Sequence, residues 1–514
     1  MARINTNVPS LIAQKTLTRS NSALETQLQR LATGLRINRG ADDPAGLIVS
    51  ERLRSELRGI TQGIKNSERA SSVIATAEGS LTEVSELLNS IKALTVEAAN
   101  TGAVSPEEVR ANQLQIDSAI ESITRIANTT RFAGLRLLDG SLGYSLSGVS
   151  ATQIHKAKVF GAQFGDRSTI NVDVQTIGSA QTANMYLRAD FATTVGGTAV
   201  DGQLPSSVTL EVTGPDGGVE LTFPSGTTMA QIVNAINQRK SVTGLQAAFN
   251  NAGNVASGLV LSSTEFGSEA FISVKKISGG TALDFAKITN NGPGPAAYGT
   301  NTASAERDEG KDVVVLVNGA VAAGRGTEVN VRNPELEMTL LLTSGFATTI
   351  NGTVSRFVIT GGGAEFQLGP EVTALQQTNV GIDSIAATRL GGTVVTGSSG
   401  NLELQFLSSL KSGGTNDLSS GQFKNASTIL ESAIDEVSGL RGRLGAFERN
   451  ILQTNVRSLQ TGFENISASE SVIRDADFAK ESSELTRSQI LVSAGTSVLA
   501  LANSNSQTVL QLLG

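Results

Sequence analysis

Hydrophobic residues recur at alternating steps of three and four positions near both ends of the chain. This spacing places them on one face of an α-helix, the pattern of helices that pack side by side or coil around one another. It predicts long helices within residues 1–131 and 401–514. The N-terminal positions that follow the spacing are Leu24, Leu28, Leu31, Leu35, Leu53, Leu57, Ile60, Ile64, Leu81, Val84, Leu88, Ile91, Ile116, Ile120 and Ile123.

The N-terminal helical segment is interrupted twice. The stretch GLRINRGADDPAGL (34–47) contains helix-breaking Gly and Pro, and its Asp42-Asp43 pair suits turn formation and capping better than metal binding or acid–base chemistry. At the second break, Ser105 is suited to cap a helix that begins at Pro106. Further on, Asp139-Gly140 predicts the turn of a β-hairpin.

The C-terminal helical segment changes register once. One series of apolar positions ends at Ile451, and the next begins out of step at Val456, which predicts a stutter near Thr454. A last helical stretch runs from about Asp475 to Gly514. The first series is Val437, Leu440, Leu444, Phe447 and Ile451, and the second is Val456, Leu459, Phe463 and Ile466.

Residues 151–400 show short alternating runs between turns. They hold seven of the 10 Pro and 34 of the 54 Gly, which punctuate turns. SSVTLEVTGPDGGVELTF (206–223) predicts two strands around a turn, TMAQIVNAINQR (228–239) predicts a helix, and further strands extend to about Leu368. The middle of the chain is therefore expected to be β-rich.

The two ends need each other to form a core. Isolated helices are marginal in water, because packing supplies most of their stability. We therefore predict an α+β fold, with a long coiled-coil-like helical bundle made from both chain ends and β-rich domains inserted in the middle. The polar extreme termini are expected to become ordered on meeting other copies of the chain.

Composition removes most catalytic chemistry. The chain has no Cys and one His, so it lacks thiolate catalysis, disulfides, Cys-ligated metals and paired His ligands. His155 is expected to be a solvated loop residue, and we expect no enzyme activity, cofactor or metal site. The first 131 residues contain no aromatic residue, so their helices must pack through aliphatic side chains.

Charge and hydropathy exclude two classes of partner. The net charge of -7 does not suit binding to nucleic-acid phosphates. No apolar run reaches the length of a transmembrane helix, so no membrane insertion is expected. The N-terminal residues do not follow the pattern of a cleaved secretory signal peptide.

Long motifs lie at both ends. They are MARINTNVPSLIAQKTL (1–17), RLATGLRINRGADDPAGLIVSERLRSELRGI (30–60), TRFAGLRLLDGS (130–141), RLGAFERNILQT (443–454), IRDADFAKESSELTRSQIL (473–491) and AGTSVLALANSNSQTVLQLLG (494–514). In this order and place they resemble bacterial flagellins. In the middle, residues 209–249 resemble the small β-rich IN motif of flagellins and hook-associated proteins.

The resemblance implies four parts of the chain. Residues 1–39 with 475–514 would form inner-tube terminal helices, and 40–150 with 401–474 a helical shell domain with a β-hairpin. Residues 151–305 would form a β-rich outer domain that contains the IN-like motif, and 306–400 a second β-rich outer unit and return linker.

The resemblance also implies function and partners. The chain would be a structural subunit that polymerises with copies of itself into the extracellular flagellar filament used for swimming. It would leave by flagellar type III export without a cleaved signal peptide. It would meet the export apparatus, an export chaperone, and cap and hook-associated proteins, and carry O-glycans on its outer domains.

Specific apolar residues are expected to pack the assembly helices. In the inner tube they would lie on both terminal helices, and in the shell on the C-terminal seam. The residues are Leu24, Leu28, Leu31, Leu35, Val437, Leu440, Leu444, Phe447, Leu499, Val509, Leu510 and Leu513.

Two other functions fit the same layout. A hook–filament junction protein is also flagellin-like at both ends, although the ending AGTSVLALAN…VLQLLG favours flagellin. A secreted β-rich surface adhesin with helical ends would need no axial polymer, so electron microscopy of the purified protein separates it from a filament subunit.

Overall fold

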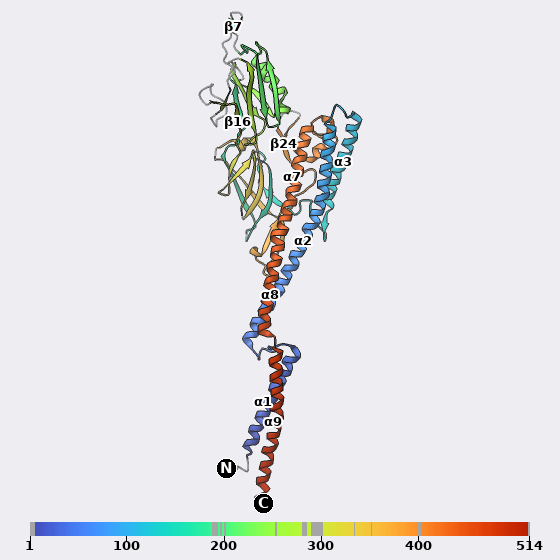
Figure 1. Ribbon diagram of the computed structural model, residues 1–514, viewed down its shortest axis with the longest axis vertical. Helices are drawn as coiled ribbons and strands as arrows, with labels where there is room; N and C mark the ends of the chain where they lie inside the picture. The colour runs from blue at the N-terminus through green and yellow to red at the C-terminus, as the bar shows by residue number, and fades with distance from the viewer. Residues whose placement is uncertain are drawn as a thin grey trace. The chain divides into compact units, whose positions relative to one another are not determined.

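The chain forms two compact units in a computed structural model (Figure 1). The helical unit comprises Met1–Ile74, Phe366–Gln377 and Leu444–Gly514, and the mixed unit comprises Ala75–Glu365 and Thr378–Arg443. The structure describes residues 6–165, 167–187, 194–195, 198–199, 202–251, 254–279, 285–288, 302–333, 335–350, 352–397 and 402–511.

The predicted helices at the two ends are confirmed. The break at residues 34–43 separates the first two helices, and the first ends where Gly34 adopts a left-handed conformation with φ of 72°. The second helix is continuous over both of its predicted apolar series. The long helices are α1 (Val8–Thr33), α2 (Pro44–Ala98), α3 (Pro106–Thr129), α7 (Phe423–Phe447), α8 (Gln453–Arg474) and α9 (Phe478–Gln511).

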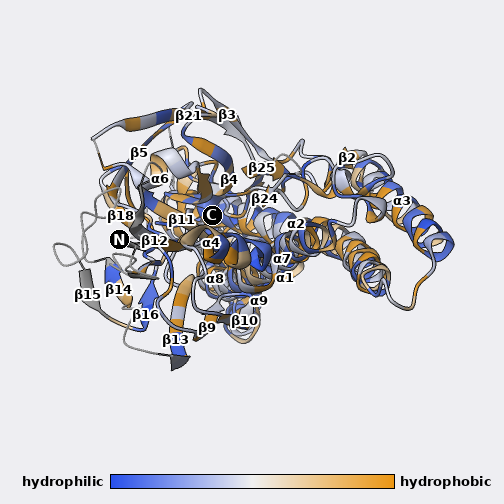
Figure 2. Cartoon of the chain, turned by 90° about the horizontal axis from the view of Figure 1, so that it is seen from above, coloured by the Kyte–Doolittle hydropathy of each residue, from blue (hydrophilic) through white to orange (hydrophobic). Residues whose placement is uncertain are grey.

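Helices α2, α3 and α7 bury aliphatic side chains in the mixed unit. Helix α3 starts with the predicted cap, because the Ser105 hydroxyl accepts from the Glu108 amide and the Glu108 carboxylate accepts from the Ser105 amide. Figure 2 shows hydrophobic and hydrophilic residues alternating along α3. The fully buried positions include Leu81, Val84, Leu88, Ile91, Ile116, Ile123, Ile429 and Leu430.

The predicted register change is a π-helix, η4 (Glu448–Leu452), which joins α7 to α8. A π-turn adds one residue to the helical repeat. As a result, Leu452 rather than Ile451 continues the buried series that includes Leu444 and Phe447: Leu452 is 1% exposed and Ile451 40%.

The larger β-sheet of the mixed unit has eight strands, all paired antiparallel. Buried and half-buried residues alternate along its strands, as in β20. In spatial order the strands are β3 (Tyr144–Ser147), β21 (Val354–Gly362), β5 (Ile170–Gly178), β17 (Val314–Val317), β18 (Ala320–Arg325), β19 (Glu328–Arg332), β20 (Leu336–Leu342) and β4 (Ile154–Ala162).

A smaller domain is inserted between β5 and β17. Its entry and exit strands meet where the backbones of Gln181 and Lys311 exchange two hydrogen bonds of 2.8 and 2.9 Å. It has two sheets and helix α4 (Met229–Gln238), packed around one core. The first sheet is β10 (Gly217–Phe223), β9 (Val208–Gly214), β13 (Phe271–Gly279) and β16 (Arg307–Glu309), and the second is β11 (Leu245–Asn251), β12 (Asn254–Ser263), β6 (Asn184–Leu187), β14 (Phe285–Ile288) and β15 (Thr302–Ser304).

Short elements complete the described chain. They are β1 (Arg131–Phe132), β2 (Leu135–Arg136), β7 (Thr194–Val195), β8 (Thr198–Ala199), β22 (Ala364–Gln367), β23 (Gln377–Val380), β24 (Thr393–Thr396), β25 (Leu402–Gln405), α5 (Lys240–Thr243), α6 (Ser344–Thr348), η1 (Ala374–Gln376), η2 (Leu407–Leu410) and η3 (Leu418–Ser420).

The predicted boundary between outer domains at residues 305 and 306 is wrong. Strands β4 and β5 belong to the same sheet and core as β17 to β21, which come after the inserted domain. Neighbours in an antiparallel sheet can lie far apart in sequence, so the order of strand-like runs did not reveal that the first and last runs pair with each other.

Two local predictions are also wrong. The hairpin of β1 and β2 turns at Ala133-Gly134, not at Asp139-Gly140. Ala133 and Gly134 have positive φ values of 48° and 89°, as a two-residue hairpin turn requires. His155 lies half-buried in strand β4 rather than in a solvated loop.

An ion-pair cluster links the large sheet to α7. The Glu436 carboxylate on α7 contacts the ammonium groups of Lys156 and Lys158 on β4, the latter at 2.8 Å. Burial opposes ionisation of Glu436, but the two ammonium groups outweigh it and lower its pKa below the ordinary 4.5.

Glu436→Gln is expected to destabilise the mixed unit at pH 7 by about 3 kcal/mol, since it leaves two largely buried ammonium groups without their carboxylate. A carboxyl with a lowered folded-state pKa stabilises the fold above its unfolded pKa, and this contribution disappears as pH falls through the folded pKa. Calorimetry of both proteins should therefore show a gap in the free energy of unfolding that narrows as pH falls below about 4.5 and through the lowered pKa of Glu436. The matched control is Glu431→Gln, whose exposed pair with Lys92 should contribute at most about 1 kcal/mol. An equal gap at pH 7 and pH 3 would contradict the assignment.

Candidate assembly surface

Helices α1 and α9 run antiparallel, side by side, in the helical unit (Figure 1). At one end, the Asn7 side chain donates to the Ala502 carbonyl at 3.0 Å. At the other, Arg30 pairs with Glu481 at 3.2 Å. Between them, the absent side chain of Gly495 allows Leu17 to approach, because a Cβ there would lie 3.2 Å from Leu17 Cδ1. The pairing thus extends along most of both helices.

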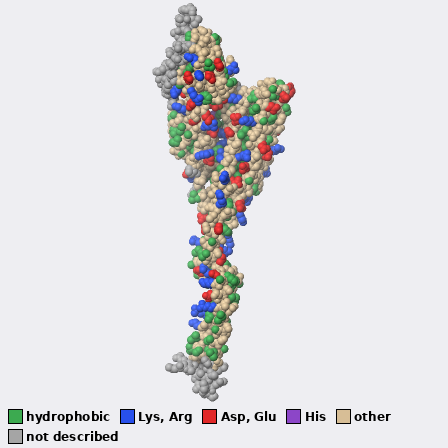
Figure 3. Space-filling view, in the orientation of Figure 1, with side chains coloured by type: hydrophobic (Ala, Val, Ile, Leu, Met, Phe, Trp, Pro, Cys, Tyr) green, Lys and Arg blue, Asp and Glu red, His purple; other side chains and the backbone are tan. Residues whose placement is uncertain are grey.

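The pair buries few side chains and leaves many apolar side chains exposed. Among the described side chains of the two helices, only Ala13, Glu481 and Ser488 are buried. Figure 3 shows hydrophobic side chains gathered over the surface of this pair. The large exposed apolar residues are Val8, Leu11, Ile12, Leu28, Phe478, Ile490, Leu491, Val498 and Leu501. A soluble monomer rarely leaves so much apolar surface open, which makes this surface the candidate assembly surface.

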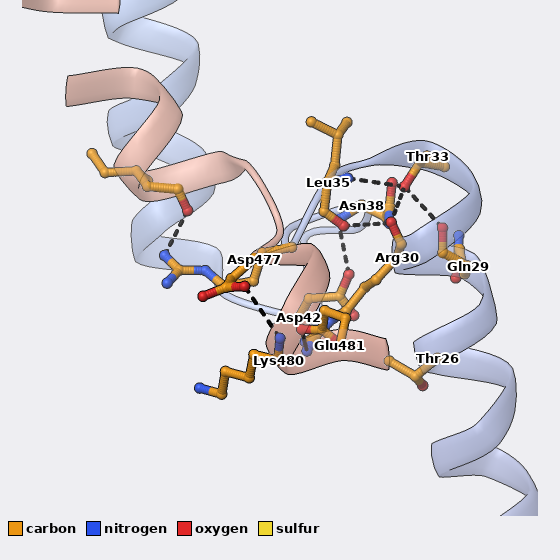
Figure 4. Close-up of polar contacts among 12 residues, drawn as sticks. Thr26, Gln29, Arg30, Thr33, Leu35, Asn38, Asp42, Asp477, Lys480 and Glu481 are labelled. Atoms are coloured by element: carbon orange, nitrogen blue, oxygen red, sulfur yellow. Dashed lines mark hydrogen bonds and ion pairs between the residues drawn. The ribbon is translucent and has the colours of Figure 1, made fainter. Parts of the chain in front are cut away.

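The loop between α1 and α2 fixes the end of the pair at which α1 ends and α9 begins (Figure 4). Its backbone joins the α8–α9 connection through the Arg36 amide to the Arg474 carbonyl at 2.7 Å and the Ala476 amide to the Gly34 carbonyl at 2.9 Å. These bonds hold the start of α9 beside the end of α1.

The predicted turn and capping roles of Asp42 and Asp43 are confirmed. The Asp42 carboxylate accepts from the Arg39 and Asn38 amides, and these hydrogen bonds lower its pKa. Asp43 accepts from the Gly46 amide in the first turn of α2. Among the described residues, no group of three or more His, Cys, Asp and Glu is placed to hold a metal ion. Within that same part of the chain, no helix is long and apolar enough to span a membrane.

The predicted assembly residues fall into separate groups. Leu24, Leu31, Leu35 and Leu499 are half-buried, and Leu28 is exposed. The side chains of Val509 and Leu510, and all of Leu513, lie outside the described residues. In contrast, Val437, Leu440, Leu444 and Phe447 are buried within the single chain.

Sequence reasoning missed most of the exposed apolar residues. Spacings of three and four identify residues that share one helix face, but the apolar residues of α9 are spread around its circumference. The signal that would have found them is a helix whose apolar residues lie on several faces rather than on one.

Comparison with known proteins identifies the family. The model of the bacterial flagellin N-terminal helical region matches residues 4–142, that of the bacterial flagellin C-terminal helical region matches 427–513, and that of the flagellin hook IN motif matches 207–265. The chain belongs to the bacterial flagellin family. Members of this family are structural proteins, so the chain is a non-enzymatic subunit of the extracellular flagellar filament that serves motility.

Similarity to individual flagellins covers the whole chain. It is 27% identical to a flagellin of Salmonella choleraesuis (strain SC-B67), 27% to flagellin A of Helicobacter pylori and 28% to the B-type flagellin of Pseudomonas aeruginosa, over 99% of both chains in each case. The matched IN motif lies in the inserted domain.

Likeness to solved structures is weak. The flagellar hook associated protein-3 of Legionella pneumophila is 12% identical with a TM-score of 0.29, over 82% of this chain and 97% of that one. FliC from Burkholderia pseudomallei is 17% identical with a TM-score of 0.23, over 75% and 99%. Scores this low support no argument about the fold.

Proposed function

We propose that copies of this chain polymerise through the outer surface of the α1–α9 pair, which forms the inner layer of the filament. The observation that carries this proposal is the exposed apolar surface of the pair, on which residues such as Ile490 and Leu501 are more than half exposed in the single chain. Burial of that apolar surface against neighbouring copies supplies the core that one chain lacks.

The proposed layers follow the helix breaks. Residues 1–39 with 475–514 form the inner layer, since α1 ends at Thr33 and α9 begins at Phe478. Residues 40–150 with 401–474 form the surrounding helical layer. The inserted domain and the strands of the large sheet other than β3 lie outside it. In this arrangement, Leu24, Leu28, Leu31, Leu35 and Leu499 pack the inner layer together with Val509, Leu510 and Leu513.

We also propose that the chain passes through the flagellar type III export apparatus without a cleaved signal peptide, with the help of an export chaperone. A chain without Cys has no disulfide to prevent passage in an unfolded form. In the same proposal, cap and hook-associated proteins contact it at the ends of the filament, and O-glycans attach to its Ser- and Thr-rich outer domains.

Cryo-electron microscopy of filaments grown from the purified full chain tests the layering. We expect α1 and α9 at the smallest radius and strands β9 and β13 at a larger one. A filament with α1 and α9 on its outer surface would contradict the proposal. Growth that stops at short rings would favour the hook–filament junction alternative, and no polymer at all would favour the adhesin.

A further inference from the structure

A loop of the helical unit, Phe366–Gln377, is fastened to the α2–α8 helix pair. The Asn66 amide group donates to the Gln367 carbonyl at 3.1 Å, and the Asn455 amide group donates to the Leu368 carbonyl at 3.0 Å. Two glycines of α2 leave room for this approach. A Cβ on Gly63 would lie 2.8 Å from the Leu368 carbonyl oxygen, and one on Gly59 would lie 2.8 Å from Pro370 Cβ.

The loop is rigidly built, yet it exposes two apolar side chains. The Gln376 side chain accepts from the Glu371 amide at 2.7 Å, and the Gln367 side chain donates to the Glu371 carbonyl at 2.7 Å. On this frame, Val372 is 84% exposed and Leu375 is 99% exposed. An ordered loop that presents apolar side chains has already lost the conformational entropy that binding would otherwise remove. We call Val372 and Leu375 the knob.

An open groove lies on the same helix pair, where η4 joins α8. It has a volume of about 410 Å³ and a mainly apolar surface. The α2 residues that line it are Ser67, Glu68 and Ser71, and the residues from η4 and α8 are Leu452, Gln453, Val456 and Arg457. The two serines are small and lie opposite the π-turn, where the added residue interrupts regular side-chain packing.

The knob and the groove lie on opposite sides of the helix pair. Successive residues of a helix are about 100° apart, so Asn66 and Glu68 point to opposite sides of the buried Ser67. Asn66 binds the loop, and Glu68 lines the groove. On the antiparallel α8, Asn455 and Val456 divide in the same way. A knob therefore cannot enter the groove of its own chain.

We propose that the knob of one copy of this chain inserts into the groove of the next copy in the filament. The proposal rests on the proposed polymerisation and adds a specific contact to it. Complementary patches on opposite sides make a head-to-tail contact, which repeats without closing, as a helical polymer requires.

Cysteine cross-linking tests the contact, because the chain has no Cys of its own. Filaments of the L375C/V456C double variant should, on oxidation, give a ladder of covalent oligomers on denaturing gels, since disulfides need Cα atoms within about 7 Å. The two single variants should show no ladder. The same holds for the double variant V321C/V456C, in which the cysteine at position 321 lies on the exposed face of β18. Double-variant filaments that are visible by electron microscopy yet give only monomers would overturn the contact.

A second variant covers the case in which the cysteines themselves hinder assembly. Leu375→Asp should raise the critical concentration of polymerisation at least fivefold, while thermal unfolding of the unassembled chain stays unchanged. A critical concentration equal to that of the wild type would overturn the contact. If the wild-type chain forms no filaments, the proposed polymerisation itself fails, and the contact fails with it.

Discussion

Leu501→Asp is expected to raise the critical concentration for filament growth by at least tenfold. Leu501 is exposed on α9 in the single chain and would be buried against neighbouring copies. Burial of a Leu side chain contributes about 1.5–3 kcal/mol, and about 1.4 kcal/mol corresponds to a factor of ten in affinity. Sedimentation of polymer from the purified chain at a series of concentrations measures the effect. Ile490→Asp should act in the same way.

The control is Ile277→Asp, which changes an exposed apolar residue on β13 of the inserted domain. Its critical concentration should stay within about twofold of wild type, because surface substitutions away from a contact change little free energy. Both variants should unfold thermally like the wild type. If Leu501→Asp polymerises like Ile277→Asp, the outer surface of α9 is not the assembly surface.

Arg30→Glu is expected to separate α1 from α9 and to abolish filaments. Glu481 is 5% exposed, and Arg30 is its ion-pair partner across the two helices. Loss of one member of a buried pair costs about 3–5 kcal/mol, and a second carboxylate adds repulsion. Amide hydrogen exchange of the full chain should show faster exchange throughout both helices.

The reversed pair distinguishes a specific contact from general damage. Arg30→Glu combined with Glu481→Arg should recover most of the protection and the filaments, because the pair is restored with opposite polarity. Arg487→Glu on the same helix is the matched control: Arg487 is largely exposed, and its change should alter stability by less than about 1 kcal/mol. A double variant no better than Arg30→Glu alone would show that the ion pair does not set the pairing.

Local patterns predicted the elements in which neighbouring residues suffice. The series Leu81, Val84, Leu88 and Ile91 predicted a buried helix face, and all four are fully buried. The shifted series after Ile451 predicted a register change, and the π-helix η4 provides it. These predictions succeed because a helix brings residues three and four apart onto one face whatever surrounds it.

Long-range pairing had no comparable signal. Nothing in the sequence near β5 indicates that it lies between β17 and β21, because each of these strands alternates in the same way and would fit several neighbours. The same limit applies to the knob, since Val372 and Leu375 look like ordinary loop residues until the glycines and asparagines that hold the loop are seen on α2 and α8.

The sequence by itself determined the α+β class, the helical ends, the β-rich middle and the resemblance that the family comparisons confirm. Each of these depends on periodicity, turn residues or motifs contained in short stretches. Only the tertiary structure decided which apolar residues are already buried, such as Leu444, and which remain open for other copies, such as Leu501. Periodicity indicates that a residue packs against an apolar neighbour. Whether that neighbour belongs to the same chain or to another copy depends on how the whole fold packs.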